Sequence, residues 1–290
     1  MNGTVLITGA TGNVGSEVLT NLLGRGVSVR AAVTDEASAA RLPADVSNAL
    51  FDFEDPATFG AALKNVERVF LMRPPHMGDA SRFEPFIEAM TAAGVEHVVF
   101  LSLLGAEQNP VVPHRAIEKR LLASGLGCTM LRPSFYMQNL TTTHLDDIRD
   151  RGEIIVPAGR GRTSFIDVRD IGAAAALVLA EHGHIGSDYA LTGTVALSYY
   201  ECAETLSRVT GRTITYTNPS GRQFARHMEQ RGFPKEFITV MRGIYFVAKI
   251  RMASTVTDDF EKLLDREPIS FEQFAIDRAA MFNLNRDDEG

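Results

Sequence analysis

The sequence predicts an α/β fold, a doubly wound parallel sheet with a smaller, mainly helical C-terminal domain. In the first half of the chain, short apolar runs typical of strands buried on both faces alternate with segments of helical periodicity. The first apolar run, residues 5–7, leads straight into three glycines spaced by three and then into a helix. At 290 residues the chain is long enough for one large domain with a smaller one attached.

The glycine-rich stretch after the first strand predicts a dinucleotide site. Gly9, Gly12 and Gly15 follow the strand, and apolar residues from Val14 to Leu23 recur at helical spacing. Glycines allow a tight turn and let the backbone approach a pyrophosphate, while the N–H groups of a helix N-terminus attract anions. Strand, glycine turn and helix in this order provide the context of a Rossmann-type fingerprint. A plain glycine turn is the alternative, and the flanking strand and helix argue against it.

The second strand, over residues 27–33, ends where the choice between NAD and NADP is made. An acidic residue about 20 positions beyond the glycines can bind the ribose 2′-OH of NAD, whereas an arginine accepts the 2′-phosphate of NADP. Asp35 stands at that distance, with Thr34 before it, and Arg30 and Arg41 are the nearby cations. Asp35 fits the N-cap of a helix equally well.

Further strands and helices extend the sheet. Apolar runs predict strands over 49–53, 69–72, 97–102 and 128–133, with helices over 56–64, 82–93 and 114–122 between them. Ligands of such sheets bind beyond the carboxyl ends of the strands. The abrupt end of the fourth strand at Arg73 is therefore expected to lie beside the cofactor.

The character of the sequence changes after residue 150, where strands become shorter and turns more frequent. We expect a dinucleotide-binding domain over 1–150, with 165–187 returning to it. We expect a smaller substrate domain over 188–290 together with 151–164.

Residues suited to N-caps predict where the later helices begin. Asp170 is expected to cap an alanine-rich helix, and Ser270 the final one. Serine followed three residues later by Glu or Gln is the capping-box pattern. It occurs twice, at Ser198 with Glu201 and at Ser220 with Gln223.

Composition excludes several classes of protein. The net charge of −7 and the lack of a basic patch argue against nucleic acid as a partner. No apolar run approaches the length of a membrane span, and the chain enters its first strand with no leader. Cys128 and Cys202 are far apart and stand in apolar surroundings, which indicates buried free thiols. We therefore expect a cytoplasmic protein.

Taken together, the motifs resemble the NmrA-like branch of the atypical short-chain dehydrogenase/reductase family. The resemblance spans nearly the whole dinucleotide domain, and the last third is similar, more loosely, to triphenylmethane reductases and bacterial quinone reductases. It rests on the G-x-x-G-x-x-G spacing of residues 9–15 and on the segments 69–75, 98–102, 124–126, 131–140 and 165–171.

The resemblance implies a cofactor site for NADP or NAD. It places the pyrophosphate on the glycine loop, the adenine beside the third strand and the nicotinamide near the ends of the fourth to sixth strands. Members that prefer NADP carry arginine where this chain has Thr34, which leaves the choice between the two open. The implied cofactor residues, with the two at the end of the second strand, are Gly9, Thr11, Gly12, Asn13, Val14, Gly15, Thr34, Asp35, Asp52, Phe53, Leu71, Met72, Arg73, Pro133, Ser134 and Phe135.

The chain departs from the superfamily in its redox centre, a tyrosine and a lysine four residues apart. The matching stretch here is 110–114, which has no tyrosine and carries His114 at the lysine position. Carbonyl reduction through a tyrosinate is therefore not expected. A helix N-terminus favours a neutral imidazole, which can orient a ligand or relay a proton. His114 and Ser102 are the candidate catalytic residues, and the alternative for His114 is a cap or surface residue paired with Glu118.

Aromatic and thioether side chains are expected to form the wall of a substrate pocket. Core packing explains the aromatic ones nearly as well. The candidate substrate residues are Tyr136, Met137, Phe165, Tyr245 and Phe246. No Cys or carboxylate partners accompany His182 and His184, so no metal site is expected.

These features predict an NAD(P)H-dependent oxidoreductase that passes hydride from nicotinamide to a quinone-like or conjugated aromatic small molecule. Such acceptors are electron-poor and need little acid catalysis. The alternative is a non-catalytic NAD(P)-binding redox sensor acting through a protein partner, which the missing tyrosine favours. A nucleotide-sugar epimerase ranks last because it needs the Tyr and Lys pair. A homodimer is a further expectation.

Overall fold

The computed structural model describes residues 3–283 and forms two compact units, each assembled from separate stretches of the chain. The first unit comprises Met1–Pro133, Val168–Leu191 and Asp259–Arg266, and the second comprises Ser134–Asp167, Thr192–Asp258 and Glu267–Gly290. The chain leaves the first unit at Pro133, before the boundary expected at 150. The assignment of nucleotide and substrate roles to the two units stays a prediction.

The first unit contains a seven-stranded sheet in the order β3-β2-β1-β4-β5-β6-β9, and every neighbouring pair is parallel. This confirms the Rossmann-type doubly wound sheet. The strand order reverses between β1 and β4, and such a switch point is where these sheets bind ligands. The strands are β1 Thr4–Ile7, β2 Val29–Val33, β3 Ser47–Leu50, β4 Val66–Met72, β5 His97–Leu101, β6 Gly127–Pro133 and β9 Asp188–Leu191.

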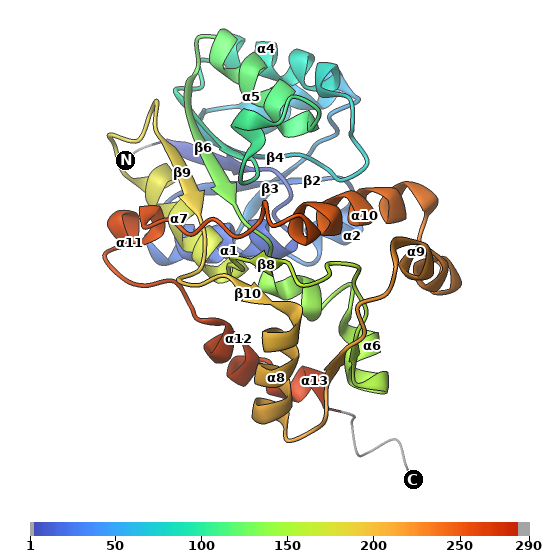
Figure 1. Cartoon of the computed structure of the whole chain (residues 1–290). Coiled ribbons are helices and arrows are strands. Elements are labelled where there is room, and N and C mark those ends of the chain that lie inside the picture. Colours follow the sequence, from blue (N-terminus) through green and yellow to red (C-terminus); the bar gives the residue numbers. More distant parts are fainter. Residues whose placement is uncertain (1–2, 284–290) are drawn as a thin grey trace. The chain divides into compact units, whose positions relative to one another are not determined.

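Helices cover both faces of this sheet (Figure 1). On one face α1 Asn13–Gly24 packs on α7 Val168–Ala180, so closely that a Cβ on Gly172 would lie 2.4 Å from Cβ of Glu17. The other face carries α3 Phe59–Leu63, α4 Glu84–Ala92 and α5 Pro113–Ala123. The unit also contains α2 Glu36–Ala39, α11 Asp259–Leu264 and the 3-10 turns η1 Pro56–Thr58, η2 Ala80–Phe83 and η3 Ala106–Gln108.

The core beneath α3, α4 and α5 contains an aromatic cluster. The rings of Phe53 and Phe86 lie 4.7 Å from the ring of Phe51, centroid to centroid. Edge-to-face contacts of this kind add to the stabilisation from burial. β3 ends at Leu50 instead of continuing to residue 53, and Asp52 accepts a hydrogen bond from the backbone of Glu54 in the turn that follows.

Asp170 is not the N-cap of α7, which corrects the expectation. The helix begins at Val168, so Asp170 lies within its first turn. Its carboxylate, which is fully buried, accepts a hydrogen bond of 2.7 Å from Arg266 near the end of α11. The residue therefore joins α7 to a segment that is distant in sequence, a contact that local pattern does not reveal.

The second unit is mainly helical, as predicted. Both capping boxes form, with Ser198 accepting from the backbone of Glu201 and Ser220 from that of Gln223. Ser270 caps its helix as expected. The elements are η4 Met137–Leu140, α6 Leu145–Arg151, β7 Glu153–Ile154, β8 Arg162–Thr163, β10 Leu197–Ser198, α8 Tyr199–Thr210, β11 Thr215–Tyr216, α9 Gly221–Gln230, α10 Lys235–Lys249, α12 Phe271–Asp277 and α13 Ala279–Phe282.

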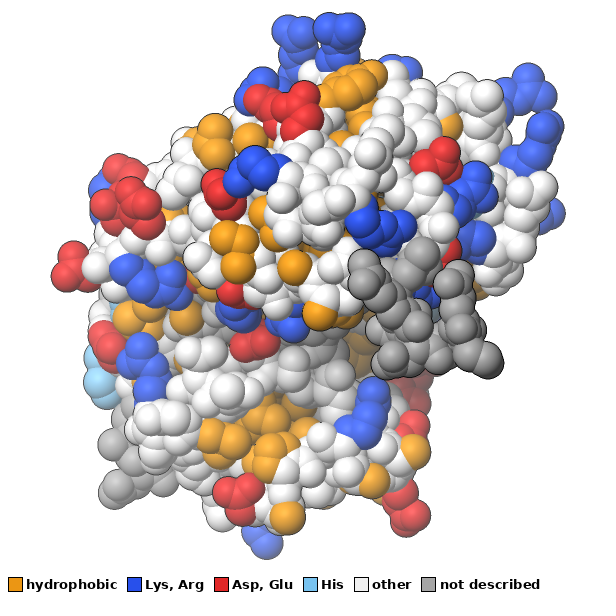
Figure 2. Space-filling view, turned by 90° about the horizontal axis from the view of Figure 1, so that it is seen from below, with side chains coloured by type: hydrophobic (Ala, Val, Ile, Leu, Met, Phe, Trp, Pro, Cys, Tyr) orange, Lys and Arg blue, Asp and Glu red, His pale blue; other side chains and the backbone are white. Residues whose placement is uncertain are grey.

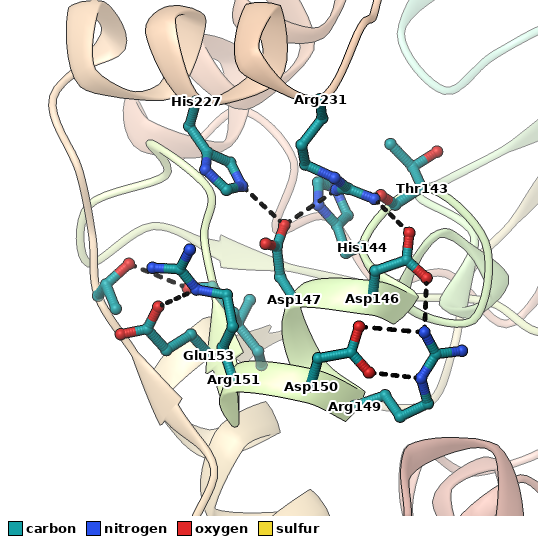
Figure 3. A network of polar contacts seen from close by, with 12 residues as sticks. Thr143, His144, Asp146, Asp147, Arg149, Asp150, Arg151, Glu153, His227 and Arg231 are labelled. Carbon is teal, nitrogen blue, oxygen red and sulfur yellow. Dashed lines mark hydrogen bonds and ion pairs between the residues drawn. The ribbon is translucent and has the colours of Figure 1, made fainter. Parts of the chain in front are cut away.

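A polar network ties α6 to the end of α9 in the second unit (Figure 3). Asp147, only 4% exposed, accepts from Nε2 of His227 and from Arg231, each at 2.9 Å. Arg231 also reaches Asp146, which in turn accepts from Arg149. A buried carboxylate with two donors is well satisfied, so the network fixes the position of α6.

Acidic and basic side chains both occur on the face drawn in Figure 2, among separate apolar patches. Ion pairs link exposed side chains among the described residues, as between Arg208 and Glu272 at 2.6 Å. Within residues 3–283, no helix combines the length and the apolar character needed to cross a bilayer.

Candidate functional site

The glycine loop begins at Thr8, a buried residue that holds the loop against β4. Its hydroxyl donates to the carbonyl of Phe70 at 3.1 Å and accepts from the backbone N–H of Met72 at 2.8 Å. The carboxyl ends of β1 and β4 are therefore joined at the switch point. Gly9 follows with φ of +66°, a left-handed conformation suited to glycine.

Gly12 and Gly15 have different reasons to lack a side chain. A Cβ on Gly15 would lie 2.1 Å from the carbonyl oxygen of Gly9, so the loop can close only with glycine there. A Cβ on Gly12 would lie 3.3 Å from the same oxygen, a tight contact that small adjustments relieve. The fold therefore requires a glycine less strictly at position 12 than at position 15.

The N-terminus of α1 is open to a ligand. Gly12 is its N-cap, no side chain caps the helix, and no acidic residue lies in its first turn. The free N–H groups and the helix dipole favour an anion at this position. Loop and helix together fit the diphosphate of a dinucleotide. This arrangement brings together the predicted residues Gly9, Thr11, Gly12, Asn13, Val14 and Gly15.

Asp35 serves as the N-cap of α2. One carboxylate oxygen accepts from the backbone of Ser38 at 2.6 Å, and the other accepts from the hydroxyl of Thr34 at 3.2 Å. The hydrogen bonds from Ser38, chiefly that of its backbone, lower the pKa of Asp35. Of the two interpretations left open by the sequence, the structure shows the cap.

At the expected adenine border, Asp52 is exposed and Phe53 is 8% exposed within the aromatic cluster. At the end of β4, Leu71 is fully buried in the core. Met72 extends its methyl group over the glycine turn, where a Cβ on Gly9 would lie 2.1 Å from it. The roles of these residues toward a cofactor stay predictions.

Arg73, just beyond β4, turns its guanidinium onto the loop that follows. Nη1 donates to the carbonyls of Pro74, Pro75 and Met77 at distances of 2.9 to 3.1 Å. Nε donates to Nε2 of His114 at 3.5 Å, a long hydrogen bond. Burial lowers the pKa of Arg73. Arg73 therefore fixes both its own loop and the imidazole.

His114 lies in the first turn of α5, beside Phe100 of β5. Burial, and then the charge of Arg73, lower its pKa to about 4, against a smaller opposing effect of Glu118. The ring is thus neutral at neutral pH. Because Nε2 accepts from Arg73, the proton resides on Nδ1, a buried atom with no hydrogen-bond partner within residues 3–283. A buried donor without a partner fits a ligand oxygen.

Ser102 belongs to a buried polar cluster around Glu118. The Ser102 hydroxyl donates to the fully buried Glu118 at 2.7 Å, and Arg132 donates to both oxygens of Glu118 at 2.9 and 3.2 Å. Burial works to raise the pKa of Glu118, but the hydrogen bonds from Arg132 and Ser102 outweigh it, so the pKa is lowered. The cluster joins β5, β6 and α5. Glu118 was expected only as a partner for His114, and its hydrogen-bond partners are instead Ser102, Arg115 and Arg132, a cluster that the sequence pattern did not predict.

The predicted residues after β6 belong to the second unit, apart from Pro133, the last residue of the strand. Ser134 is buried and accepts from Ser164 at 3.0 Å, and Phe135 packs against the core of this unit. Burial raises the pKa of the Tyr136 hydroxyl to about 12. Each residue is positioned by the second unit's own packing.

The remaining candidate substrate residues differ in exposure. Met137, Phe165 and Tyr245 lie in the core of the second unit, each at most 3% exposed. Tyr245 also hydrogen-bonds the buried His144. Phe246, by contrast, is 58% exposed on α10. Their roles toward a substrate stay predictions. Within residues 3–283, no cluster of three or more His, Cys, Asp or Glu residues is arranged to bind a metal.

Comparisons with known proteins agree with this geometry. The model of the NmrA-like family matches residues 1–275. An NAD(P)H azoreductase from Xenophilus azovorans is 34% identical over 283 residues, which cover 96% of this chain and 99% of that protein. The structure of an Escherichia coli quinone oxidoreductase with NADPH has a TM-score of 0.85 and 29% identity, covering 93% of this chain and 98% of that one. The structure of a Citrobacter sp. triphenylmethane reductase with NADP(H) has a TM-score of 0.83 and 26% identity, covering 95% and 99%.

Proposed function

This chain belongs to the NmrA-like family, and from that premise we propose that it is an NAD(P)H-dependent oxidoreductase. Its acceptor is a quinone-like or conjugated aromatic small molecule. The observation that carries the proposal is the open N-terminus of α1 behind a glycine loop at the switch point of the sheet. The relatives named for azo, quinone and triphenylmethane reduction support the class of acceptor.

The cofactor would be held by the first unit. A bound NAD(P)H would supply hydride from its nicotinamide ring. The glycine loop, with Gly9, Gly12 and Gly15, would bind the diphosphate through backbone N–H groups and the dipole of α1. Thr8 would keep that loop aligned with the end of β4. These groups are fixed in advance by the sheet, which suits precise positioning.

His114 would orient the ligand as a neutral hydrogen-bond donor. Its Nδ1 carries the proton and lacks a protein partner within residues 3–283, and its pKa of about 4 keeps the ring uncharged at neutral pH. Ser102 is already bonded to Glu118. That supports a role for Ser102 in positioning the end of β5, and makes His114 the stronger candidate for ligand contact.

Electron-poor conjugated acceptors suit a site without the superfamily's tyrosine. Charge that develops on such a molecule is delocalised, so a strong positioned acid contributes little, and the proton can come from water. Carbonyl reduction of an isolated ketone would lack that help. The proposal therefore favours quinones, azo compounds and cationic dyes over simple ketones and aldehydes.

Steady-state assays with a panel of acceptors test this function. With NADPH or NADH supplied, we expect saturable turnover of quinone-like, azo or triphenylmethane compounds and negligible turnover of simple ketones. A panel without turnover, at nucleotide concentrations shown by titration to saturate the protein, would leave the redox sensor as the function.

We also expect a cytoplasmic location and a homodimeric assembly. Both cysteines are buried free thiols, which supports a reducing compartment such as the cytoplasm. A homodimer is the expected assembly, and the mass of the protein measured by light scattering tests it. A mass of one chain would contradict it.

A further inference from the structure

Hydroxyl and guanidinium donors gather between α2 and the glycine loop. Nη2 of Arg41, just beyond α2, donates to the Thr11 hydroxyl of the glycine loop at 3.2 Å and to that of Ser38 at 3.5 Å. The Thr34 hydroxyl lies 3.5 Å from that of Ser38. All four residues belong to the first unit. In dinucleotide-binding sheets, this region beyond the second strand meets the adenosine ribose.

The carboxylate of Asp35, which would bind the ribose of NAD, already accepts hydrogen bonds from the protein. Its two oxygens accept from the backbone of Ser38 and the hydroxyl of Thr34, and the capping hydrogen bond is short at 2.6 Å. Releasing an N-cap destabilises the helix that it begins. A ribose 2′-OH would therefore have to compete with the helix for this carboxylate.

We propose that Arg41 binds the 2′-phosphate of NADP and makes this chain prefer NADPH to NADH. The inference rests on the proposed function and assigns its nucleotide. An arginine fork matches a phosphate dianion through two parallel hydrogen bonds. The position where NADP-preferring relatives are expected to carry arginine holds Thr34, and Arg41 supplies the charge from beyond α2 instead.

The contacts of Arg41 explain why it is ready for this role. Its hydrogen-bond partners are neutral hydroxyls, which exchange readily for a charged phosphate, and its charge also contributes to lowering the pKa of the nearby Asp35. Arg30, the second residue of β2, donates instead to the carbonyls of Ala62 and Lys64 at 3.0 and 2.6 Å. Arg30 therefore offers a control with the same charge.

Calorimetric titration with 2′,5′-ADP and 5′-ADP isolates the 2′-phosphate. We expect wild type to bind 2′,5′-ADP more tightly, and Arg41→Ala to weaken that binding about tenfold or more, the scale of one charge-assisted contact. Binding of 5′-ADP should change less than about twofold, within the additivity expected of an untouched contact. Arg41→Lys should recover part of the loss, and Arg30→Ala should leave the ratio of the two affinities as in wild type.

Parallel titrations with NADPH and NADH separate the role of Arg41 in selecting NADP from the proposed function as a reductase. Loss of NADPH affinity in Arg41→Ala with NADH affinity retained supports the inference. Equal losses for both nucleotides, no loss, or a wild type that prefers NADH would overturn it while leaving the reductase intact. A folded wild type that binds neither nucleotide would overturn the proposed function, and the inference with it.

Discussion

Nε of Arg73 lies 3.5 Å from Nε2 of His114, which links the end of β4 to the first turn of α5. The contact decides which imidazole nitrogen carries the proton, because arginine only donates. It also lowers the pKa of the ring, although burial lowers it more. The neutral state of His114 and the proton on Nδ1 therefore depend in part on Arg73.

Replacing Arg73 should change the titration of His114. Arg73→Gln removes the positive charge, so the pKa of His114 should rise from about 4 toward the ordinary 6.5. Arg73→Lys keeps the charge and should leave the pKa low. NMR titration of the His114 ring signals measures both. Identical titration curves for the two variants would show that burial alone sets the pKa.

The effect of replacing His114 on turnover should depend on whether the new side chain keeps a hydrogen-bond donor near the position of Nδ1. His114→Leu removes the Nδ1 donor and should lower kcat about tenfold or more, while His114→Asn places an amide N–H near the Nδ1 position and should retain much of it. Nucleotide titration of each variant separates binding from turnover. Equal kcat values for wild type and His114→Leu would rule out the proposed role.

Substitution by alanine should have different effects at Gly12, Gly15 and Gly24, the N-cap and two residues of α1. Gly12→Ala should fold and bind dinucleotide about tenfold or more weakly, because the methyl group blocks close approach of the phosphates. Gly15→Ala should instead destabilise the fold, because its Cβ would meet the Gly9 carbonyl. Gly24→Ala, with nothing within 4 Å, is the control. Thermal unfolding and calorimetry distinguish these effects, and unchanged binding in Gly12→Ala would contradict the site.

The network around Asp147 should stabilise the second unit. Asp147→Ala leaves His227 and Arg231 without their buried acceptor, although Arg231 keeps Asp146, and should cost about 3 kcal/mol of unfolding free energy, the lower end of the range for a broken buried pair. Arg149→Ala, at exposed ion pairs with Asp146 and Asp150, should cost much less. Urea unfolding measures both. Equal costs would contradict the structural account of α6.

Three buried histidines predict the pH dependence of stability. Burial is the main cause that lowers the pKa of His97 and His114 to about 4, and that of His144 to about 3. Unfolding returns each to about 6.5, so below that pH the unfolded chain binds more protons than the folded chain. Their contribution is therefore complete above about pH 6.5 and declines as the pH falls toward 4.

Urea unfolding between pH 7 and about pH 5 checks this decline, in a window above most carboxylate titrations. Each histidine should add up to about 1.4 kcal/mol per pH unit to the slope. A folded His97→Gln variant should show a shallower slope than wild type. A flat profile in wild type would mean that these rings take up protons as readily in the native state as in the unfolded chain.

Local pattern predicted the sheet, the glycine loop and the capped helices. Ser198 and Glu201 lie three residues apart, so their mutual capping is readable directly from the chain. Strands buried on both faces are also readable, because each is a continuous apolar run.

The contacts that complete the candidate site could not be predicted from local pattern. Thr11 and Arg41 are 30 residues apart, and Arg73 and His114 are 41 apart. Both pairs meet only because the sheet brings the ends of its strands to one edge. The role of Asp35 could not be predicted for a different reason. A carboxylate can cap a helix or bind a ribose, and the groups around it in the folded chain determine which of the two it does.

Single-turnover oxidation of bound nucleotide tests the central claim most directly. Protein loaded with one equivalent of NADPH is mixed, without oxygen, with increasing concentrations of a quinone, and the reduced nicotinamide signal is followed. The account predicts stoichiometric loss of that signal, at a rate that saturates with quinone and falls in His114→Leu. Nicotinamide that remains bound and reduced at every concentration, for quinone, azo and triphenylmethane acceptors alike, would contradict it.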